Sequence, residues 1–384
     1  MINSVRCLIW YWGTGGAGIR FTHRVACEIG SQIGSHNICL SLHEKNAWID
    51  KARSEGFVVE IIGGPFGFRQ SIQMVLSLPS RLLVFVRQLN RFNPDVLVIP
   101  MNFALAWPLV MVARMKRIKV VYVVHDASPH PGEYFPRLLN FTQSRIIKQA
   151  SRLVTLSDYV RASLMYLYPL ETHVKPVVIP LSSHCVQRRD TAAVIEGLPV
   201  RFLFLGRMLR YKGLDVILGA AKLMEHRRDW QLTFAGNGSE VEELKREVGT
   251  LAQIDMSLIG WLTESEIDSV LETHHVLLCP YLEASQSGVI SEAASYGMPS
   301  IVASVGGLAD QIGKGRAGWL CKPGSPESLA EAMIKIIEND ASYSEKAVAA
   351  LARIPSKAGT TPWGTMIEGI ALQAQAASAG PERK

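Results

Sequence analysis

Two basic residues, five positions apart, carry the most specific chemical signal in the sequence. An apolar run at 201–205 ends in Gly206 and Arg207, and Lys212 with Gly213 follows after a short loop. Arginine grips phosphate oxygens as a planar fork, whereas the lysine ammonium acts as a compact point charge. Two cations at the end of a buried strand therefore favour binding of a diphosphate. The alternative is that both charges are merely solvated at the surface.

A segment of small residues points to a second anion-binding feature. Residues 283–299 run from Glu283 through Gly288 and Glu292 to Pro299, and we expect a helix to begin near Gly288. The first N–H groups of a helix are free and its dipole is positive there, so this end holds anions. Glycine also lets a ligand approach the backbone closely. Glu292 can accept hydrogen bonds from two ribose hydroxyls, or it is an ordinary partner of the helix dipole.

Two glycine turns give weaker signals. Gly236-Asn-Gly238 follows an expected strand, and it forms either part of a nucleotide-binding wall or only a turn. In the N-terminal half, the turn at 13–18 can bring backbone, including Gly15 and Gly16, close to a phosphate or a sugar. Its glycines lack the G-x-G-x-x-G spacing of a dinucleotide-binding site, so a nicotinamide dehydrogenase is disfavoured.

His125 ends the expected strand Val120–Val124. A histidine at the carboxyl end of a central strand can bond a sugar hydroxyl or assist deprotonation of an acceptor, although a structural role is the alternative. The sequence contains no Asp-x-Asp pattern of manganese ligands. We therefore expect chemistry without a metal or other cofactor, in which Arg207, Lys212 and a helix N-terminus neutralise a leaving diphosphate.

Short apolar strands that alternate with amphipathic segments must position these residues. This alternation predicts a parallel sheet with right-handed crossovers, that is, an α/β fold. In the N-terminal half the expected strands are Val5–Trp10, Asn37–Leu42, Val58–Ile62, Val96–Ile99, Val120–Val124, Arg152–Leu156 and Val177–Ile179. The pattern breaks at the polar stretch 182–198 and restarts with Arg201–Leu205, Trp230–Ala235, Asp255–Ile259, Val276–Cys279, Ser300–Ala303 and Gly318–Cys321.

The chain is therefore expected to hold two Rossmann-like domains. We place them at 1–185 and 199–360, followed by a C-terminal helix and tail at 361–384. Ligands of open α/β sheets bind beyond the carboxyl ends of the strands, so two such domains imply a cleft between them.

The composition fits this plan and limits the partners. Hydrophobic residues make up 48% of the 384 residues, enough for two cores, and the formal charge of +6 suits an anionic partner. No nucleic-acid-binding motif is visible, so we expect no nucleic-acid partner. Six scattered cysteines and the lack of a signal peptide favour a reduced, cytoplasmic protein. The apolar run 96–113 is interpreted as a buried strand and helix, with a membrane span as the alternative.

The segment 66–92 raises the question of a membrane surface. Apolar residues recur there at helical spacing, with Arg69, Arg81, Arg87 and Arg91 among them. A basic amphipathic helix can lie in an anionic membrane interface, which would make the protein peripheral on the inner face. The alternative is a helix packed on the sheet of the N-terminal domain.

Taken together, these motifs resemble the retaining glycosyltransferases of the GT-B fold, family 4. The resemblance rests on Gly-Arg-x4-Lys-Gly, Ala-Gly-Asn-Gly, the segment from Glu283 to Pro299, and Val305-Gly-Gly. It implies that Arg207 and Lys212 hold the donor diphosphate, with further contacts from the N–H groups of Gly288, Val289 and Ile290. It also implies that Glu292 binds the ribose, Glu283 the transferred sugar and His125 the donor sugar and acceptor, and that the C-terminal helix with Trp363 returns to the N-terminal domain.

One departure from the family pattern affects Glu283. The family separates its two glutamates by seven residues, which would put Ala284 in the first position, but eight residues separate Glu283 from Glu292 here. The resemblance implies a hexosyltransferase that moves sugar from a nucleotide-diphosphate donor to a saccharide or lipid-linked saccharide, in envelope or exopolysaccharide synthesis. The alternatives are a nucleotide-sugar epimerase or hydrolase of the same fold, and a non-catalytic sugar-nucleotide-binding protein.

Overall fold

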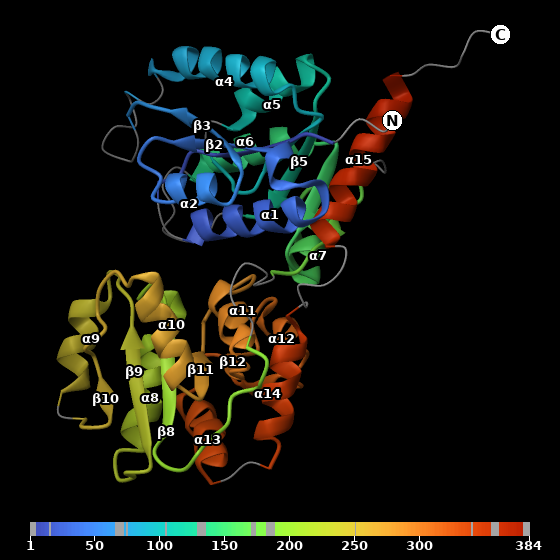
Figure 1. Cartoon of the computed structure of the whole chain (residues 1–384). Helices are drawn as coiled ribbons and strands as arrows, with labels where there is room; N and C mark the ends of the chain where they lie inside the picture. The colour runs from blue at the N-terminus through green and yellow to red at the C-terminus, as the bar shows by residue number, and fades with distance from the viewer. Residues whose placement is uncertain are drawn as a thin grey trace. The chain divides into compact units, whose positions relative to one another are not determined.

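The chain divides into two compact units. The first comprises Met1–Pro180 with Ala358–Lys384, and the second comprises Leu181–Lys357 (Figure 1). The computed structural model describes residues 5–14, 17–65, 73, 76–103, 106–128, 136–169, 174–181, 189–249, 251–338, 341–354 and 361–378. The polar stretch at which the strand pattern breaks is described from Arg189 onwards and belongs to the second unit, where Arg189 N donates to Ser295 O (3.0 Å) and Ala193 N to Gly297 O (3.3 Å).

A seven-stranded parallel sheet forms the centre of the first unit, in the order β3-β2-β1-β4-β5-β6-β7. Its strands are β1 Cys7–Tyr11, β2 Ile38–His43, β3 Val58–Ile62, β4 Val96–Ile99, β5 Lys119–Val124, β6 Arg152–Thr155 and β7 Val177–Val178. The inner strands are buried, as in β4, in which all four residues are buried, whereas the edge strands β3 and β7 are partly exposed. The strand order reverses between β1 and β4, the point at which open α/β sheets bind ligands.

Helices cover both faces of this sheet. Figure 1 shows α1 and α2 on one side and α4 and α5 on the other. The helices of the unit are α1 Ala17–Ile33, η1 Ser35–Asn37, α2 Ile49–Ser54, α4 Leu78–Phe92, α5 Ala106–Met115, α6 Pro136–Ile147, α7 Asp158–Leu167 and α15 Pro362–Ser378. The apolar run 96–113 forms β4 and most of α5, and no helix within the described residues is long and apolar enough to cross a membrane.

The amphipathic segment 66–92 is described mainly as α4, and this helix packs on the sheet. Phe85, Leu89 and Phe92 of α4 are buried in the core of the unit. Arg81, expected on a basic face, is instead buried, and its guanidinium donates to Pro65 O. The apolar face of Leu78–Phe92 is therefore used within the protein. Arg69 lies outside the described residues.

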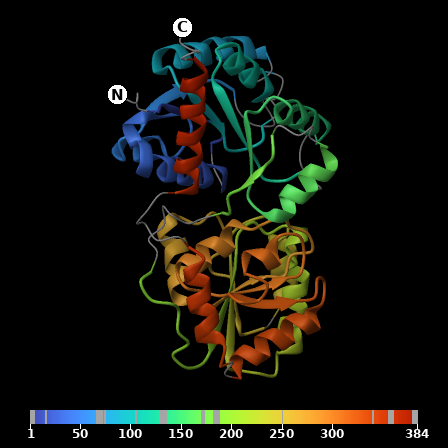
Figure 2. The same cartoon turned by 90° about the vertical axis from the view of Figure 1, so that its right-hand side faces the viewer.

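The C-terminal helix belongs to the first unit. Figure 2 shows α15 running along that unit, and the helix packs against α1. Trp363 is 2% exposed, and Thr361 Oγ1 donates to Glu28 O at 2.7 Å. A side chain at Gly364 would collide with Gln32, so the glycine permits the close approach of the two helices.

The second unit is built on a six-stranded parallel sheet in the order β10-β9-β8-β11-β12-β13, which reverses between β8 and β11. The strands are β8 Val200–Leu205, β9 Trp230–Ala235, β10 Ile254–Asp255, β11 Val276–Cys279, β12 Ser300–Ala303 and β13 Gly318–Cys321. The expected strand 255–259 is wrong in its extent, because only Ile259 pairs beyond Asp255, as an isolated bridge to Gly236. The helical elements are η3 Arg210–Lys212, α8 Leu214–Leu223, α9 Val241–Val248, α10 Glu264–Thr273, α11 Gly288–Ser295, α12 Leu308–Gln311, α13 Pro326–Ile337 and α14 Tyr343–Ala352.

Candidate functional site

The loop after β8 places two cations beside the point where the strand order of the second sheet reverses, between β8 and β11. Arg207 is exposed immediately beyond the strand, and Lys212 closes the short η3 turn. The Lys212 ammonium lies 3.7 Å from the centre of the Tyr281 ring. Burial lowers the pKa of Lys212 to about 8, against an opposing effect of Cys279, and the charge of Arg207 lowers it as well. An anion bound here would offset both the cost of removing the ammonium from water and the repulsion between the two cations.

Glycines bring the neighbouring turn against this loop. A Cβ at Gly236 would lie 2.0 Å from Gly206 O, and one at Gly238 would lie 2.0 Å from Met208 O. Met208 N donates to Asn237 O at 2.8 Å, which joins the two turns. Gly236 and Gly238 therefore have a packing function: they allow the turn after β9 to contact the loop after β8.

The N-terminus of α11 lies beside the same loop. Val289 Cγ1 is 3.9 Å from the position of a Cβ at Gly206, whereas a Cβ at Gly288 would meet nothing within 4 Å. The N-cap residue Ser287 makes no side-chain cap bond. Its backbone is held by Gln311, which accepts from Ser287 N (2.7 Å) and donates to Ser287 O (3.0 Å). The helix thus presents its positive end, at Gly288, Val289 and Ile290, beside Gly206 and towards open space.

The loop before α11 shows how Ala284, which occupies the first glutamate position of the family pattern, and the neighbouring Glu283 are placed. Ala284 is buried, and a Cβ at Gly306 would lie 1.7 Å from its carbonyl oxygen, so this residue is packed against the loop after β12. Glu283 is exposed, and Glu292, within α11, is partly exposed. Glu283 is therefore the carboxylate that the loop leaves accessible.

His125 follows β5 in the first unit. Its Nε2 lies 2.8 Å from Pro100 O, and because a carbonyl only accepts, Nε2 carries the proton. The ring contacts Phe21 edge to face at 4.7 Å between centroids. Burial lowers the pKa of His125, although Asp126 and the bond to Pro100 act the other way. The imidazole is therefore neutral near pH 7, with Nδ1 as an acceptor.

A glutamine that the sequence analysis missed holds the loop that begins at His125. Gln143, buried on α6, donates from Nε2 to Asp126 O (3.0 Å) and Ala127 O (3.1 Å). Its Oε1 accepts from Asn102 Nδ2 (3.0 Å) and Tyr122 Oη (3.4 Å). The available signal was a polar residue three positions before the buried pair 146–147 on one helix face.

The two described glycines of the turn after β1, Gly13 and Gly18, pack against a side chain of the same strand. A Cβ at Gly13 would lie 2.2 Å from Tyr11 Oη, and one at Gly18 would lie 2.4 Å from the same atom. These glycines therefore make room for the Tyr11 ring. Gly15 and Gly16, predicted to contact the donor, lie outside the described residues.

Trp261 was also missed, although it is 80% exposed. It follows Gly260, whose N–H donates to Gly236 O at 2.8 Å, while Gly236 N donates to Leu258 O at 3.0 Å. The loop that carries this indole is thereby joined to the turn after β9. The only signal in the sequence was a tryptophan directly after a glycine, because its exposure and its neighbouring turn are visible only in the structure.

Comparisons with known proteins agree with this architecture. The family model "Glycosyl transferases group 1" matches residues 199–339, and the model "Glycosyl transferase 4-like domain" matches residues 42–180. Glycogen synthase of Mycobacterium tuberculosis is 24% identical over 273 residues, which cover 69% of this chain and 65% of the synthase. The match thus spans slightly less than two thirds of that relative.

Solved structures resemble the whole chain. A glycosyltransferase of Rickettsia africae aligns with a TM-score of 0.74 at 15% identity, covering 99% of this chain and 100% of the other. HepE of Anabaena, in complex with UDP and glucose, aligns with a TM-score of 0.70 at 14% identity, covering 98% of this chain and 100% of HepE. By its two matching family models and its fold, the chain belongs to the group 1 glycosyltransferases and has the GT-B fold.

Proposed function

We propose that this glycosyltransferase moves a hexosyl group from a nucleotide-diphosphate sugar to a saccharide or lipid-linked saccharide, with retention of the anomeric configuration. The observation that carries the proposal is the convergence of Arg207, the half-buried Lys212 and the positive end of α11 at the point where the strand order reverses. The UDP and glucose bound to HepE, which shares the fold, support a nucleotide-sugar donor.

In the proposed reaction, the bond between the anomeric carbon and the diphosphate oxygen breaks, and negative charge accumulates on the diphosphate. Arg207, Lys212 and the N–H groups of Gly288, Val289 and Ile290 stabilise that charge, so the reaction proceeds without a metal or other cofactor. Glu292 accepts hydrogen bonds from the ribose hydroxyls, and Glu283 contacts the transferred sugar. The acceptor oxygen forms the new bond to the anomeric carbon and gives up its proton to the leaving diphosphate.

His125 fits the acceptor side of this chemistry. With Nε2 committed to Pro100 O, its neutral Nδ1 can accept a hydrogen bond from a sugar hydroxyl. Gln143 is proposed as a positioning residue, because it fixes the backbone that follows His125.

Trp261 offers a stacking surface for the base of the donor. Its loop is attached to the turn after β9 and lies beyond β10, the second strand from β8. Two strand spacings amount to about 10 Å. That separation lets the ribose lie between a stacked base at Trp261 and a diphosphate at Arg207, and stacking on an aromatic ring contributes about 1–3 kcal/mol per base.

The donor site is tested by thermal stabilisation with UDP, GDP, ADP and their sugars in the presence of EDTA. We expect one nucleotide series to stabilise the protein, Arg207→Ala to abolish the shift, and Arg210→Ala, an exposed neighbour in the same loop, to keep it. A shift that survives in Arg207→Ala, or no shift with any nucleotide, would contradict the site.

Turnover then separates the alternative functions. Transfer that depends on an added saccharide or lipid-linked saccharide supports the proposed reaction. Release of nucleotide or isomerised donor without acceptor would identify a hydrolase or an epimerase, and binding without turnover on any acceptor pool would identify a binding protein. The anomeric configuration of the product, read by NMR coupling, tests retention.

A role in envelope or exopolysaccharide synthesis, on the cytoplasmic face of a membrane, completes the proposal. With the apolar face of α4 packed inside, attachment to anionic lipid relies on exposed apolar side chains such as Leu83 (60%) and Met115 (82%). Arg87 follows Leu83 by four residues on α4, and Lys116 follows Met115 directly. Flotation with anionic vesicles, compared with neutral vesicles and with the Leu83→Ser/Met115→Ser double variant, tests this. Equal flotation of both proteins would reject attachment through this surface.

A further inference from the structure

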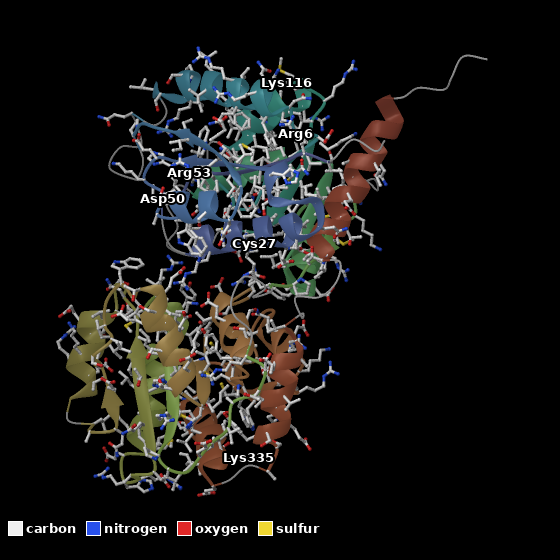
Figure 3. All side chains as sticks on the ribbon, in the orientation of Figure 1. Arg6, Cys27, Asp50, Arg53, Lys116 and Lys335 are labelled. Atoms are coloured by element: carbon white, nitrogen blue, oxygen red, sulfur yellow. The ribbon has the colours of Figure 1, made fainter. Side chains whose placement is uncertain are left out.

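Three metal-ligating side chains meet on the first unit, and none of them takes part in the proposed reaction. His23 and Cys27 lie one turn apart on α1, and Glu55 follows the last residue of α2. One ligand atom from each residue lies within 4.8 Å of the others. Figure 3 labels Cys27 on α1, and Asp50 and Arg53 on α2 of the same unit.

The separation of the ligand atoms is close to what one metal ion requires. Cys27 Sγ lies 3.6 Å from His23 Nε2 and 3.8 Å from Nδ1 of the same ring, so the thiol must turn towards the Nε2 lone pair before both atoms can bind one ion. Zinc bonds of about 2.0–2.1 Å to nitrogen and about 2.3 Å to sulfur, at a tetrahedral angle, require a separation of about 3.5 Å. Glu55 Oε2 contacts the same Nε2 directly, so a small retreat of this carboxylate opens the position that the ion occupies.

The surroundings hold the ligands and leave a route for an ion. His23 is 5% exposed and packs edge to face on Trp48, with 4.5 Å between ring centroids. Cys27 is partly exposed and the Glu55 side chain is 33% exposed. The imidazole is thus held in place, while the thiol and the carboxylate can be reached from solvent.

We propose that His23, Cys27 and Glu55 bind a thiophilic divalent cation, zinc above all, that fastens α1 to the end of α2. Nitrogen, sulfur and carboxylate ligands with water in the fourth position form a set that zinc accepts. Binding displaces the proton of the Cys27 thiol, and the one on Nε2 of His23 where it is present, so affinity rises with pH. The site is independent of the proposed reaction, which uses no residue of this cluster.

Cobalt is the probe, because a thiolate bound to Co²⁺ gives a charge-transfer band that carboxylate and imidazole ligands do not give. The full-length protein, dialysed against chelator, is titrated with Co²⁺ and then with Zn²⁺. We expect one equivalent of Co²⁺ to produce the band and Zn²⁺ to remove it. Cys27→Ser should lose the band, whereas His23→Gln and Glu55→Gln should weaken Co²⁺ binding at least tenfold.

Two exposed neighbours supply the controls: His36→Gln and Asp50→Asn should bind as the unmodified chain does. A measurement on the unmodified protein avoids the risk that a variant misfolds. Bound zinc should protect Cys27 from alkylation, and peptide mass spectrometry locates the alkylated residue. The proposal is overturned if no charge-transfer band forms, if the band persists in Cys27→Ser, or if zinc leaves the alkylation rate of Cys27 unchanged.

Discussion

At the scale of single residues, the phosphate-binding assignment makes a rate prediction. If Arg207 stabilises the leaving diphosphate, Arg207→Ala should lower kcat/KM by a factor on the order of 10²–10³, the usual cost of one such donor. Arg210→Ala, three positions away and also exposed, should retain nearly full activity. Steady-state kinetics with the cognate nucleotide sugar make the comparison. Similar losses in both variants would show only a general effect of positive charge.

The lowered pKa of Lys212 predicts a pH dependence of donor binding. Its pKa of about 8 means that the free protein loses this charge as the pH rises through 8. Because a diphosphate prefers the protonated amine, donor affinity should be roughly tenfold weaker at pH 9 than at pH 7. Lys212→Arg keeps its charge throughout this range, so the pH dependence should disappear. Isothermal titration at several pH values measures it, and an equal slope in Lys212→Arg would exclude Lys212 as its source.

The positioning function of Gln143 is tested by removing its hydrogen bonds while keeping its size. Gln143→Leu leaves Asp126 O, Ala127 O and the amide of Asn102 without this partner. We expect kcat to fall at least tenfold and its pH profile to shift, because His125 loses its fixed setting, while donor binding in the second unit stays unchanged. Gln149→Leu, a partly buried glutamine near the end of the same helix, is the control. Unchanged kcat in Gln143→Leu would reject the positioning role.

At the scale of elements, alanine variants of two glycines distinguish the effect of tight packing from the effect of blocking a ligand. Gly238→Ala brings a Cβ within 2.0 Å of Met208 O, a backbone atom that cannot move easily, so we expect a loss of about 1–3 kcal/mol in stability together with weaker donor binding. Gly288→Ala meets nothing within 4 Å and should keep the melting temperature, but its methyl group obstructs a ligand at the N-terminus of α11. Calorimetry and donor titration of both variants test this contrast. Full donor affinity in Gly288→Ala would place the donor elsewhere.

The strands could be predicted from sequence, because a buried parallel strand is a continuous apolar run. Val96–Ile99 and Val276–Cys279 are such runs and have the expected bounds, whereas 255–259 is broken, because the strand at this edge of the sheet ends at Asp255 and only Ile259 pairs again, as an isolated bridge. The candidate site was less predictable. The partners of Gln143 lie 16 to 41 residues away, and Tyr11 fills the space that Gly13 and Gly18 leave, which no local pattern shows.

At the scale of the whole molecule, α15 links the end of the chain to the stability of the first unit. Trp363 is fully buried there, so Trp363→Ala should cost about 3–5 kcal/mol in the unfolding of that unit. The second unit, Leu181–Lys357, is a continuous stretch that contains no part of α15. Its unfolding transition, identified by its shift with nucleotide, should therefore keep its midpoint while that of the first unit moves down.

Leu372→Ala, which removes a 47% exposed side chain from the same helix, should leave both transitions in place. Differential scanning calorimetry with and without nucleotide resolves the two units. A Trp363→Ala variant that lowers both transitions equally would mean that the units unfold as one cooperative body. An unchanged first transition would mean that α15 adds little to the unit it packs on, despite its contacts with α1.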